Sequence, residues 1–292
     1  MYTYTWYQWL SFFFIYCFIG WCFESTYVSI RKKHFVNRGF LHIPMLPIYG
    51  SGAIILLFVS IPVENNYFLM FILGMAAATL LEYVTGAAME ALFKVKYWDY
   101  SNQKFNYKGY ICLSSSITWG FFAIILTKII HRTIESVVLD LDKNMNMVIV
   151  IVVSSIFVAD VIVSTHAAWD IRKVIEKMTL LKEELEGLEE SLKQLSAENK
   201  VRLENFKEES KERLEEFKEN VKEHSEKLKE RAGTPNKSKE SIAERIKDLK
   251  EEYKGTANRI NFFNSSLIKG NPSASSKHFR EAYEDLKNKF RK

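Results

Sequence analysis

Apolar residues gather in five long runs in the first part of the chain, and each run carries few charges. The runs cover residues 7–30, 43–61, 67–93, 110–130 and 147–169. An α-helix needs about 20 apolar residues to cross the hydrocarbon core of a bilayer. The runs therefore predict about five transmembrane helices and an all-α fold class, a multi-span helical membrane bundle. The second run is the shortest and begins with Pro44 and Pro47, which a helix tolerates near its start.

After residue 170 the apolar positions follow a different spacing, alternating between three and four residues. This part of the stripe consists of Ile171, Val174, Met178, Leu181, Leu185, Leu188, Leu192 and Leu195. Such a spacing is typical of a coiled-coil seam. From Leu195 the period becomes eleven, through Phe206, Phe217 and Leu228, which favours a straight or slightly right-handed pair of helices. Residues 233–235 (Gly-Thr-Pro) are predicted to end this helix, and a second helix is expected to fold back on it.

Charge divides the chain in the same place as the apolar pattern. Residues 171–292 hold 29 of the 40 Lys and Arg residues and 25 of the 35 Asp and Glu residues. This contrast excludes a single soluble globular domain. We expect a transmembrane domain at 1–170, a cytoplasmic coiled coil or helical hairpin at 171–269, and a linker with a short helix at 270–292. The basic excess is small and mixed with acids, so no nucleic-acid partner is expected.

The orientation follows from the basic residues of the short loops. Four Lys or Arg residues follow the first run, four follow the third, and none follows the second. Basic loops stay on the cytoplasmic side, so we predict a multi-pass protein of the cell membrane with its N-terminus outside and its C-terminus in the cytoplasm. Cys17, Cys22 and Cys112 lie in or beside apolar runs and are expected to be buried thiols. Neither a metal site nor another cofactor is expected.

Four acidic residues lie within or at the edge of the apolar runs: Glu24, Glu82, Glu90 and Asp160. A charge near the bilayer centre costs about 2.5–3.5 kcal/mol, so such residues usually face a protein interior or a cavity. Glu82 and Glu90 project from one helix face. They predict a polar cavity that opens to the cytoplasm and binds a cation, a proton or a positively charged partner. Alternatively, Glu24 and Glu90 pair with Arg38 and other basic loop residues and fix helix ends, and Asp160 bonds a Ser or Thr.

Two loops on the predicted cytoplasmic side, 37–50 and 97–109, are rich in Gly, Asn and aromatic residues. Fixed interfacial turns would explain most of this composition. Polar loop residues nevertheless gather on the side where Glu24 and Glu90 end. The loops therefore add Asn37, Arg38, His42, Tyr49, Asp99 and Asn106 to the four acids as candidates for binding a substrate or an ion. No catalytic residue is assigned.

Several motifs together resemble a known family. They are Gly20-Trp21-Cys22-Phe23-Glu24, residues 37–50, Glu82-Tyr83, Glu90, Trp98-Asp99-Tyr100-Ser101, Asn106, Gly109, Ile111-Cys112-Leu113 and Trp119-Gly120. Over about residues 8–130 the chain is similar to the proposed type IV ABC-transporter permeases, a family that includes small vertebrate membrane proteins. It departs from related sequences at Ile43 and Tyr110, where they tend to have Gly and Arg. The resemblance implies a transport permease in the bilayer.

The chain contains no G-x-x-x-x-G-K-[ST] sequence, so a permease of this kind would need a separate P-loop ATPase, docked at the two loops. Two other classes stay open. One is a membrane-embedded enzyme for a lipid or lipid-linked substrate, in which Glu24, Arg38, His42, Glu82 and Asp99 supply acid, base and phosphate-binding groups. The other is a membrane-anchored coiled-coil scaffold. A homo-oligomer formed through the coiled coil is expected.

Overall fold

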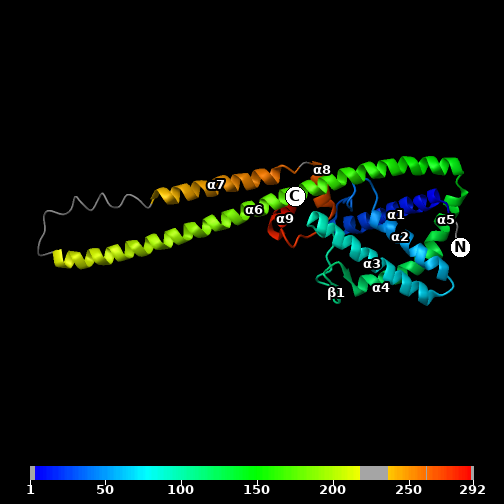
Figure 1. Cartoon of the computed structure of the whole chain (residues 1–292), viewed down its shortest axis with the longest axis horizontal. Coiled ribbons are helices and arrows are strands. Elements are labelled where there is room, and N and C mark those ends of the chain that lie inside the picture. Colours follow the sequence, from blue (N-terminus) through cyan, green and yellow to red (C-terminus); the bar gives the residue numbers. More distant parts are fainter. Residues whose placement is uncertain (1–3, 218–235, 261, 291–292) are drawn as a thin grey trace. The chain divides into compact units, whose positions relative to one another are not determined.

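The computed structural model describes residues 4–217, 236–260 and 262–290, and this part of the chain is almost entirely helical (Figure 1). The helices are α1 (Trp6–Lys32), α2 (Pro47–Ser60), α3 (Tyr67–Phe93), α4 (Leu113–Ile125), α5 (His131–Asp140), α6 (Lys143–Phe217), α7 (Asn236–Asn258), α8 (Phe262–Gly270) and α9 (Arg280–Phe290). The shorter elements are the 3-10 turn η1 (Ile61–Val63), the π-helix η2 (Leu126–Ile130), and the strands β1 (Asn106–Tyr107) and β2 (Ile111–Cys112). The two strands form an antiparallel hairpin. The fold is therefore all-α, as the apolar pattern predicts.

Four helical segments in the described residues are long and apolar enough to cross a membrane. They are Trp6–Lys32, Tyr67–Phe93, Leu113–Asp140 and Lys143–Glu208. The second predicted run forms a shorter apolar helix, Pro47–Val63. The chain thus has several apolar helices of membrane-spanning character, and a total of five spans remains a prediction.

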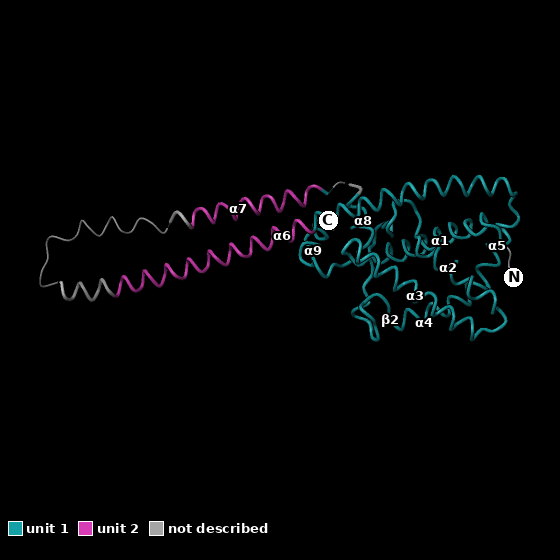
Figure 2. The backbone as a smooth tube through the Cα atoms, in the orientation of Figure 1, with its two compact units in different colours: residues 1–175, 260–292 teal, residues 176–259 magenta. Residues whose placement is uncertain are grey.

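The contacts divide the chain into two compact units (Figure 2). One unit contains residues 1–175 and 260–292, and the other contains residues 176–259. Helix α6 begins in the first unit and continues without interruption into the second. The last predicted apolar run and the predicted coiled-coil seam are therefore parts of one helix.

In the first unit α1 packs on α2, α2 on α3, and α3 on α4. Small residues allow this close packing, as expected for membrane helices. A Cβ atom placed on Gly74 of α3 would lie 2.3 Å from Cβ of Ala123 in α4. Likewise, a Cβ atom on Gly20 of α1 would lie 2.4 Å from Cβ of Tyr49 in α2. The buried core that these helices form together with η2 and α5 comprises Phe12, Tyr16, Ala53, Leu56, Leu57, Ala78, Ala123, Leu126 and Val138.

In the second unit α7 runs antiparallel to α6. Ion pairs join Lys177 to Glu252 at 2.8 Å and Glu184 to Arg245 at 2.9 Å, so the residue numbers fall on one helix as they rise on the other. Leu249 is fully buried within this unit. The pairing has the antiparallel arrangement of a helical hairpin. The predicted break at 233–235 and the stripe position Leu228 lie outside the described residues.

The segment after α8 returns to the loops of the first unit. Ser275 and Lys96 exchange two backbone hydrogen bonds, N to O, of 2.7 and 2.9 Å. The hydroxyl of Ser276 donates to the carbonyl oxygen of Lys94 at 2.7 Å. The predicted linker at 270–273 is thus the beginning of a bound segment, and α9 follows it.

Candidate functional site

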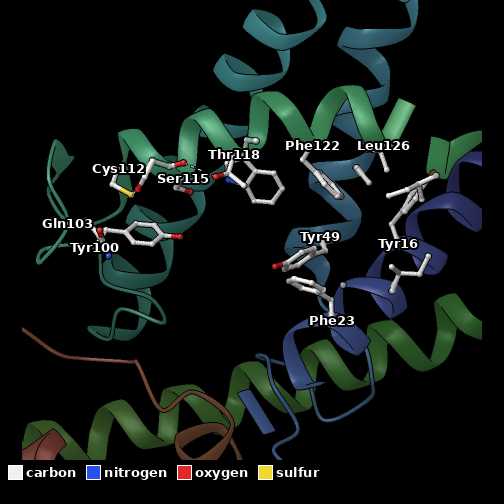
Figure 3. Close-up of a pocket in the computed structure, with 16 residues that line it drawn as sticks. Tyr16, Phe23, Tyr49, Tyr100, Gln103, Cys112, Ser115, Thr118, Phe122 and Leu126 are labelled. Carbon is white, nitrogen blue, oxygen red and sulfur yellow. Dashed lines mark hydrogen bonds between the residues drawn. The ribbon is translucent and has the colours of Figure 1, made fainter. Parts of the chain in front are cut away.

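A cavity of about 620 Å³ lies between α1 and α4, with α2 behind it and the 97–112 loop at one end. Most of its wall is apolar or aromatic. Figure 3 shows Thr118 and Phe122 on the α4 side of the cavity and Tyr49 with Phe23 on the opposite side. Phe23 is 66% exposed. Because α1 and the segment Leu113–Asp140, which includes α4, are both long and apolar enough to cross a membrane, this exposure places the cavity opening on the side where lipid chains would lie.

The loop end of the cavity carries most of its hydrogen-bonding groups. Tyr100, Gln103 and Ser115 line the wall there, and Tyr49 lies further along the cavity beside Phe23 (Figure 3). The other end is reached by Leu126 and Ile130, which belong to the π-helix η2. Short π-helical turns within longer helices often occur at functional sites. The cavity therefore offers a long apolar body with a polar end.

Behind Tyr49 lies the first of the predicted carboxylates. The Tyr49 hydroxyl donates to Oε1 of Glu24 at 2.7 Å. The other carboxylate oxygen of Glu24 lies 3.6 Å from Nε of Arg38. Glu24 is therefore compensated by a cation, and the tyrosine connects this pair to the cavity wall.

Behind Tyr100 and Ser115 lies the second carboxylate, Glu82 on α3. Its side chain accepts hydrogen bonds from the Tyr100 hydroxyl at 3.0 Å and from the Ser115 hydroxyl at 3.1 Å. Glu82 is only 6% exposed. Within the described residues no Lys, Arg or His side chain forms an ion pair with it. Glu82 is thus a buried carboxylate held in place by neutral donors, the hydroxyl groups of Tyr100 and Ser115 and the indole N–H of Trp119.

The third carboxylate, Glu90, is paired. The ammonium group of Lys96 lies 3.6 Å from Glu90 and 4.5 Å from the ring centre of Tyr110, and it donates to the carbonyl oxygen of Lys108 at 2.6 Å. Burial lowers the pKa of Lys96. A hydrogen bond to Glu90 raises the pKa of Tyr110 to about 12. The group fixes the end of α3 against the 97–112 loop.

Asp99 and Asn106 organise that loop. Asp99 accepts from the backbone N–H of Ser101 at 3.0 Å and from the Ser275 hydroxyl at 3.1 Å. Burial by itself would raise the pKa of Asp99, but the hydrogen bonds from Ser101 and Ser275 and the nearby Lys96 ammonium lower it overall. The amide of Asn106 donates to the carbonyl oxygens of Ser101 and Gln103. Both side chains thus stabilise the loop itself, the role of a fixed turn.

The fourth carboxylate, Asp160 on α6, binds the 37–50 loop. It accepts from the backbone N–H groups of His42 and Ile43 at 2.9 and 3.1 Å, and Nδ1 of His42 lies 3.1 Å from its other oxygen. Nδ1 of His42 also lies 2.9 Å from the Ser164 hydroxyl. Asn37 donates to the carbonyl oxygen of His42 at 2.9 Å. Asp160, His42 and Asn37 therefore hold this loop against α6.

The structure also contains a polar cluster that no sequence motif indicated. His131, which is 3% exposed, lies 2.8 Å through Nδ1 from the hydroxyl of Tyr16 and 3.2 Å through Nε2 from the hydroxyl of Tyr4. Tyr4 also donates to Glu135. Tyr16 lines the cavity. The one available signal was a histidine and a glutamate four residues apart at the end of an apolar run.

The ten candidate residues thus separate into distinct groups, and Tyr49 is the candidate that lines the cavity itself. Glu24 and Glu82 are connected to its wall by tyrosines, whereas Glu90, Asp99 and Asp160 brace loops. In the part of the chain that the structure describes, no three His, Cys, Asp or Glu side chains gather as they would around a metal ion. The arrangement is suited to binding through apolar contact and hydrogen bonds.

These features define a class: a multi-pass helical membrane protein with an apolar cavity between its helices. The family model described as "Putative ABC-transporter type IV" matches residues 11–165, and the chain belongs to this family. The match begins within α1 and includes α2–α5 and the first part of α6. It therefore extends beyond about residues 8–130, the region of the sequence motifs. Searches of curated proteins and of solved structures find no match.

Proposed function

We propose that the chain is a permease-like subunit that has no ATPase of its own and takes its substrate into the cavity between α1 and α4. The observation that carries this proposal is Glu82, a buried carboxylate held by Tyr100 and Ser115 at the polar end of that cavity. A carboxylate within a membrane-spanning helix is costly unless a cation, a proton or hydrogen bonds compensate it. Among the residues that the structure describes, three of the four membrane carboxylates have a basic partner nearby, and Glu82 has none.

The cavity's shape and chemistry restrict the substrate class. Phe23, Trp119 and Phe122 provide large apolar surfaces, whereas Tyr100 and Ser115 provide hydroxyl groups at one end and Tyr49 provides one further along. A volume of about 620 Å³ is in the range of pockets that hold drug-sized molecules. We infer an amphipathic substrate with an apolar body and a cationic end, which reaches the cavity sideways from the bilayer.

The proposed ATPase partner would meet a surface built from three segments. Arg38 donates to the Asn271 side chain at 2.7 Å and to the carbonyl oxygen of Gly270 at 3.2 Å. Ser275 pairs with Lys96, which precedes the other loop, and its hydroxyl donates to Asp99 within that loop at 3.1 Å. Residues 270–276 thus join the 37–50 loop to the 97–109 loop, and a docked partner would contact this joined surface or displace residues 270–276.

Binding of a lipophilic cation tests the cavity. The full chain in detergent is titrated with tetraphenylphosphonium, and binding is measured by calorimetry. Glu82→Gln is expected to weaken binding by at least roughly tenfold, because it removes the negative charge that attracts the cation. Opposite charges about 8 Å apart interact by about 2 kcal/mol at an effective dielectric constant of about 20. Glu64→Gln makes the same charge change at a carboxylate outside the cavity wall and should leave the affinity unchanged.

A second variant separates loss of the cavity from loss of the fold. Thr118 is exposed on α4 and lines the cavity, so Thr118→Trp fills the space with little effect on the core. We expect this variant to keep its melting temperature and to lose tetraphenylphosphonium binding. Equal binding by the wild type, Glu82→Gln and Thr118→Trp would contradict the proposal.

Co-purification from the native membrane tests the role of a subunit. A P-loop ATPase that is recovered with the wild type in a fixed ratio would support the role of a subunit. Docking at the joined loops predicts that Asn271→Ala loses the ATPase and that Asn144→Ala retains it. Asn144 lies at the start of α6, far along the chain from both loops, and makes the matched control. A homo-oligomer without an ATPase would contradict a permease subunit and favour a secondary transporter, an enzyme or a scaffold.

A further inference from the structure

A second cavity, of about 720 Å³, lies beside the end of α1 and is separate from the cavity proposed for the substrate. It is formed by residues 32–37, which leave α1, and by the segment from α8 to α9. Its cationic lining residues are Lys32, Lys269 and Lys287, and the imidazole of His34 also lines it. Within the described parts of the chain, no acidic side chain lines it. The basic side chains therefore come from two distant parts of the sequence and meet at one opening.

Most of this charge is uncompensated within the first unit. Lys287 has a partner, because its ammonium lies 3.5 Å from Glu284 and donates to the carbonyl oxygen of Ala274 at 3.1 Å. Among the described residues, Lys32 and Lys269 form no ion pair, and both are exposed. Two free ammonium groups at one cavity attract an anion, and charge-assisted hydrogen bonds to phosphate oxygens are stronger than neutral ones.

The position of the cavity indicates which kind of molecule would carry the anion. Lys32 is the last residue of α1, so the cavity begins where a membrane-spanning segment ends. Phe35, also in its lining, is 74% exposed, and Phe290 lines it as well. Aromatic side chains beside basic ones are characteristic of the depth of lipid headgroups. Basic pockets at such positions bind anionic headgroups.

We propose that this cavity is a binding site for a phosphate-bearing anion, with the phosphate group between Lys32 and Lys269 and an apolar part against Phe35. The bilayer supplies such a ligand as an anionic phospholipid, and the aqueous phase supplies it as a soluble phosphate ester. The site does not depend on the proposed transport function. A bound anion would join the end of α1 to residues 265–290 and so stabilise the contact of that segment with the loops.

Lipid binding to the intact protein tests the site. The full chain in detergent is titrated with palmitoyl-oleoyl phosphatidylglycerol or with the corresponding phosphatidylcholine, and bound lipid is counted by native mass spectrometry. We expect tighter binding of phosphatidylglycerol. Each lysine near a membrane surface contributes about fivefold in affinity, so the double variant Lys32→Gln/Lys269→Gln should weaken phosphatidylglycerol binding by roughly 20-fold.

The matched control is Lys104→Gln/Lys277→Gln, which removes the same charge from exposed positions outside the cavity. It should bind phosphatidylglycerol like the wild type. Equal loss in both double variants, or equal binding of the two lipids, would overturn the proposal, because either result indicates general attraction to the protein's surface. Melting temperatures of both variants show that the fold is retained.

Competition identifies the source of the phosphate. If glycerol 3-phosphate displaces phosphatidylglycerol at an equal concentration, the site exists and its ligand is a soluble phosphate ester. Failure to compete, with the dependence on Lys32 and Lys269 retained, supports the site with a membrane lipid as its ligand. In the second case the apolar contact with Phe35 contributes to the affinity, and Phe35→Ser should weaken lipid binding.

Discussion

At the scale of single residues, the four membrane carboxylates are distinguished by their partners. Glu24 has Arg38, Glu90 has Lys96, and Asp160 has His42, whereas Glu82 has hydroxyl groups. A carboxylate left alone in hydrocarbon is costly, most of all near the bilayer centre. The differences in partners therefore separate residues that brace loops from the one that we assign to substrate binding.

Asp160 should matter for stability. Asp160→Ala leaves the N–H groups of His42 and Ile43 without their acceptor, and each unmatched buried group costs about 1–3 kcal/mol. We expect the free energy of unfolding to fall by about 2–4 kcal/mol, measured by titration with sodium dodecyl sulfate. Asp170→Ala is the control, because Asp170 is exposed and a change of less than about 0.5 kcal/mol is expected there. Similar effects of the two substitutions would argue against the bracing role.

Asp99 should make stability depend on pH. Its pKa is lower in the folded chain than in the unfolded chain, so it stabilises the fold above its ordinary pKa of about 3.9. That contribution is lost as the pH falls through the lower, folded pKa. We expect the wild type to melt at a higher temperature than Asp99→Asn at pH 7, with the difference shrinking below about pH 4. A difference that is constant from pH 7 to pH 3 would contradict this assignment.

At the scale of the elements, close helix packing depends on glycine at particular positions. Gly74 and Gly52 lie on the neighbouring helices α3 and α2, and of the two only Gly74 faces a crowded neighbour. A Cβ atom on Gly52 would meet Leu81 at 3.8 Å, which is an ordinary contact, and one on Gly74 would overlap Ala123. Gly74 thus sets how closely α3 approaches α4.

The pair Gly74→Ala and Gly52→Ala tests this packing with one chemical change at two sites. We expect Gly74→Ala to lower the free energy of unfolding by about 1–3 kcal/mol, the usual cost of overpacking. Gly52→Ala should be neutral or slightly stabilising, because alanine favours helix. The measurement is unfolding in sodium dodecyl sulfate, and equal effects would show that α3 and α4 move apart easily.

At the scale of the whole molecule, the predicted orientation places the 97–109 loop in the cytoplasm and the 61–66 turn outside. The test of this orientation starts from a chain whose native cysteines are replaced. A single cysteine is then introduced at position 104 or at position 64, and its labelling is measured in intact cells. We expect a membrane-impermeant maleimide to label Glu64→Cys and to leave Lys104→Cys unlabelled until the cells are opened. The reverse pattern would invert the topology and place the joined loops outside.

The sequence by itself predicted the helices and the presence of costly acids, because hydropathy and periodicity are local properties. The long apolar runs correspond to α1, α3, the α4–α5 segment and the first part of α6. The segment that contains the fourth run continues to Asp140. The sequence also predicted, as an alternative, that Glu24 and Glu90 pair with basic loop residues, because those basic residues are close to them along the chain.

Only the tertiary structure decided which residues meet across the chain. Arg38 and Asn271 are 233 positions apart, and His42 and Asp160 are 118 apart, so no local pattern pairs them. The cavity beside Glu82 arises because α1 and α4 pack on α2 and α3 with space left between them. Hydrophobicity selects which segments become helices, but side-chain shape and polar pairing between distant segments select how those helices enclose a site.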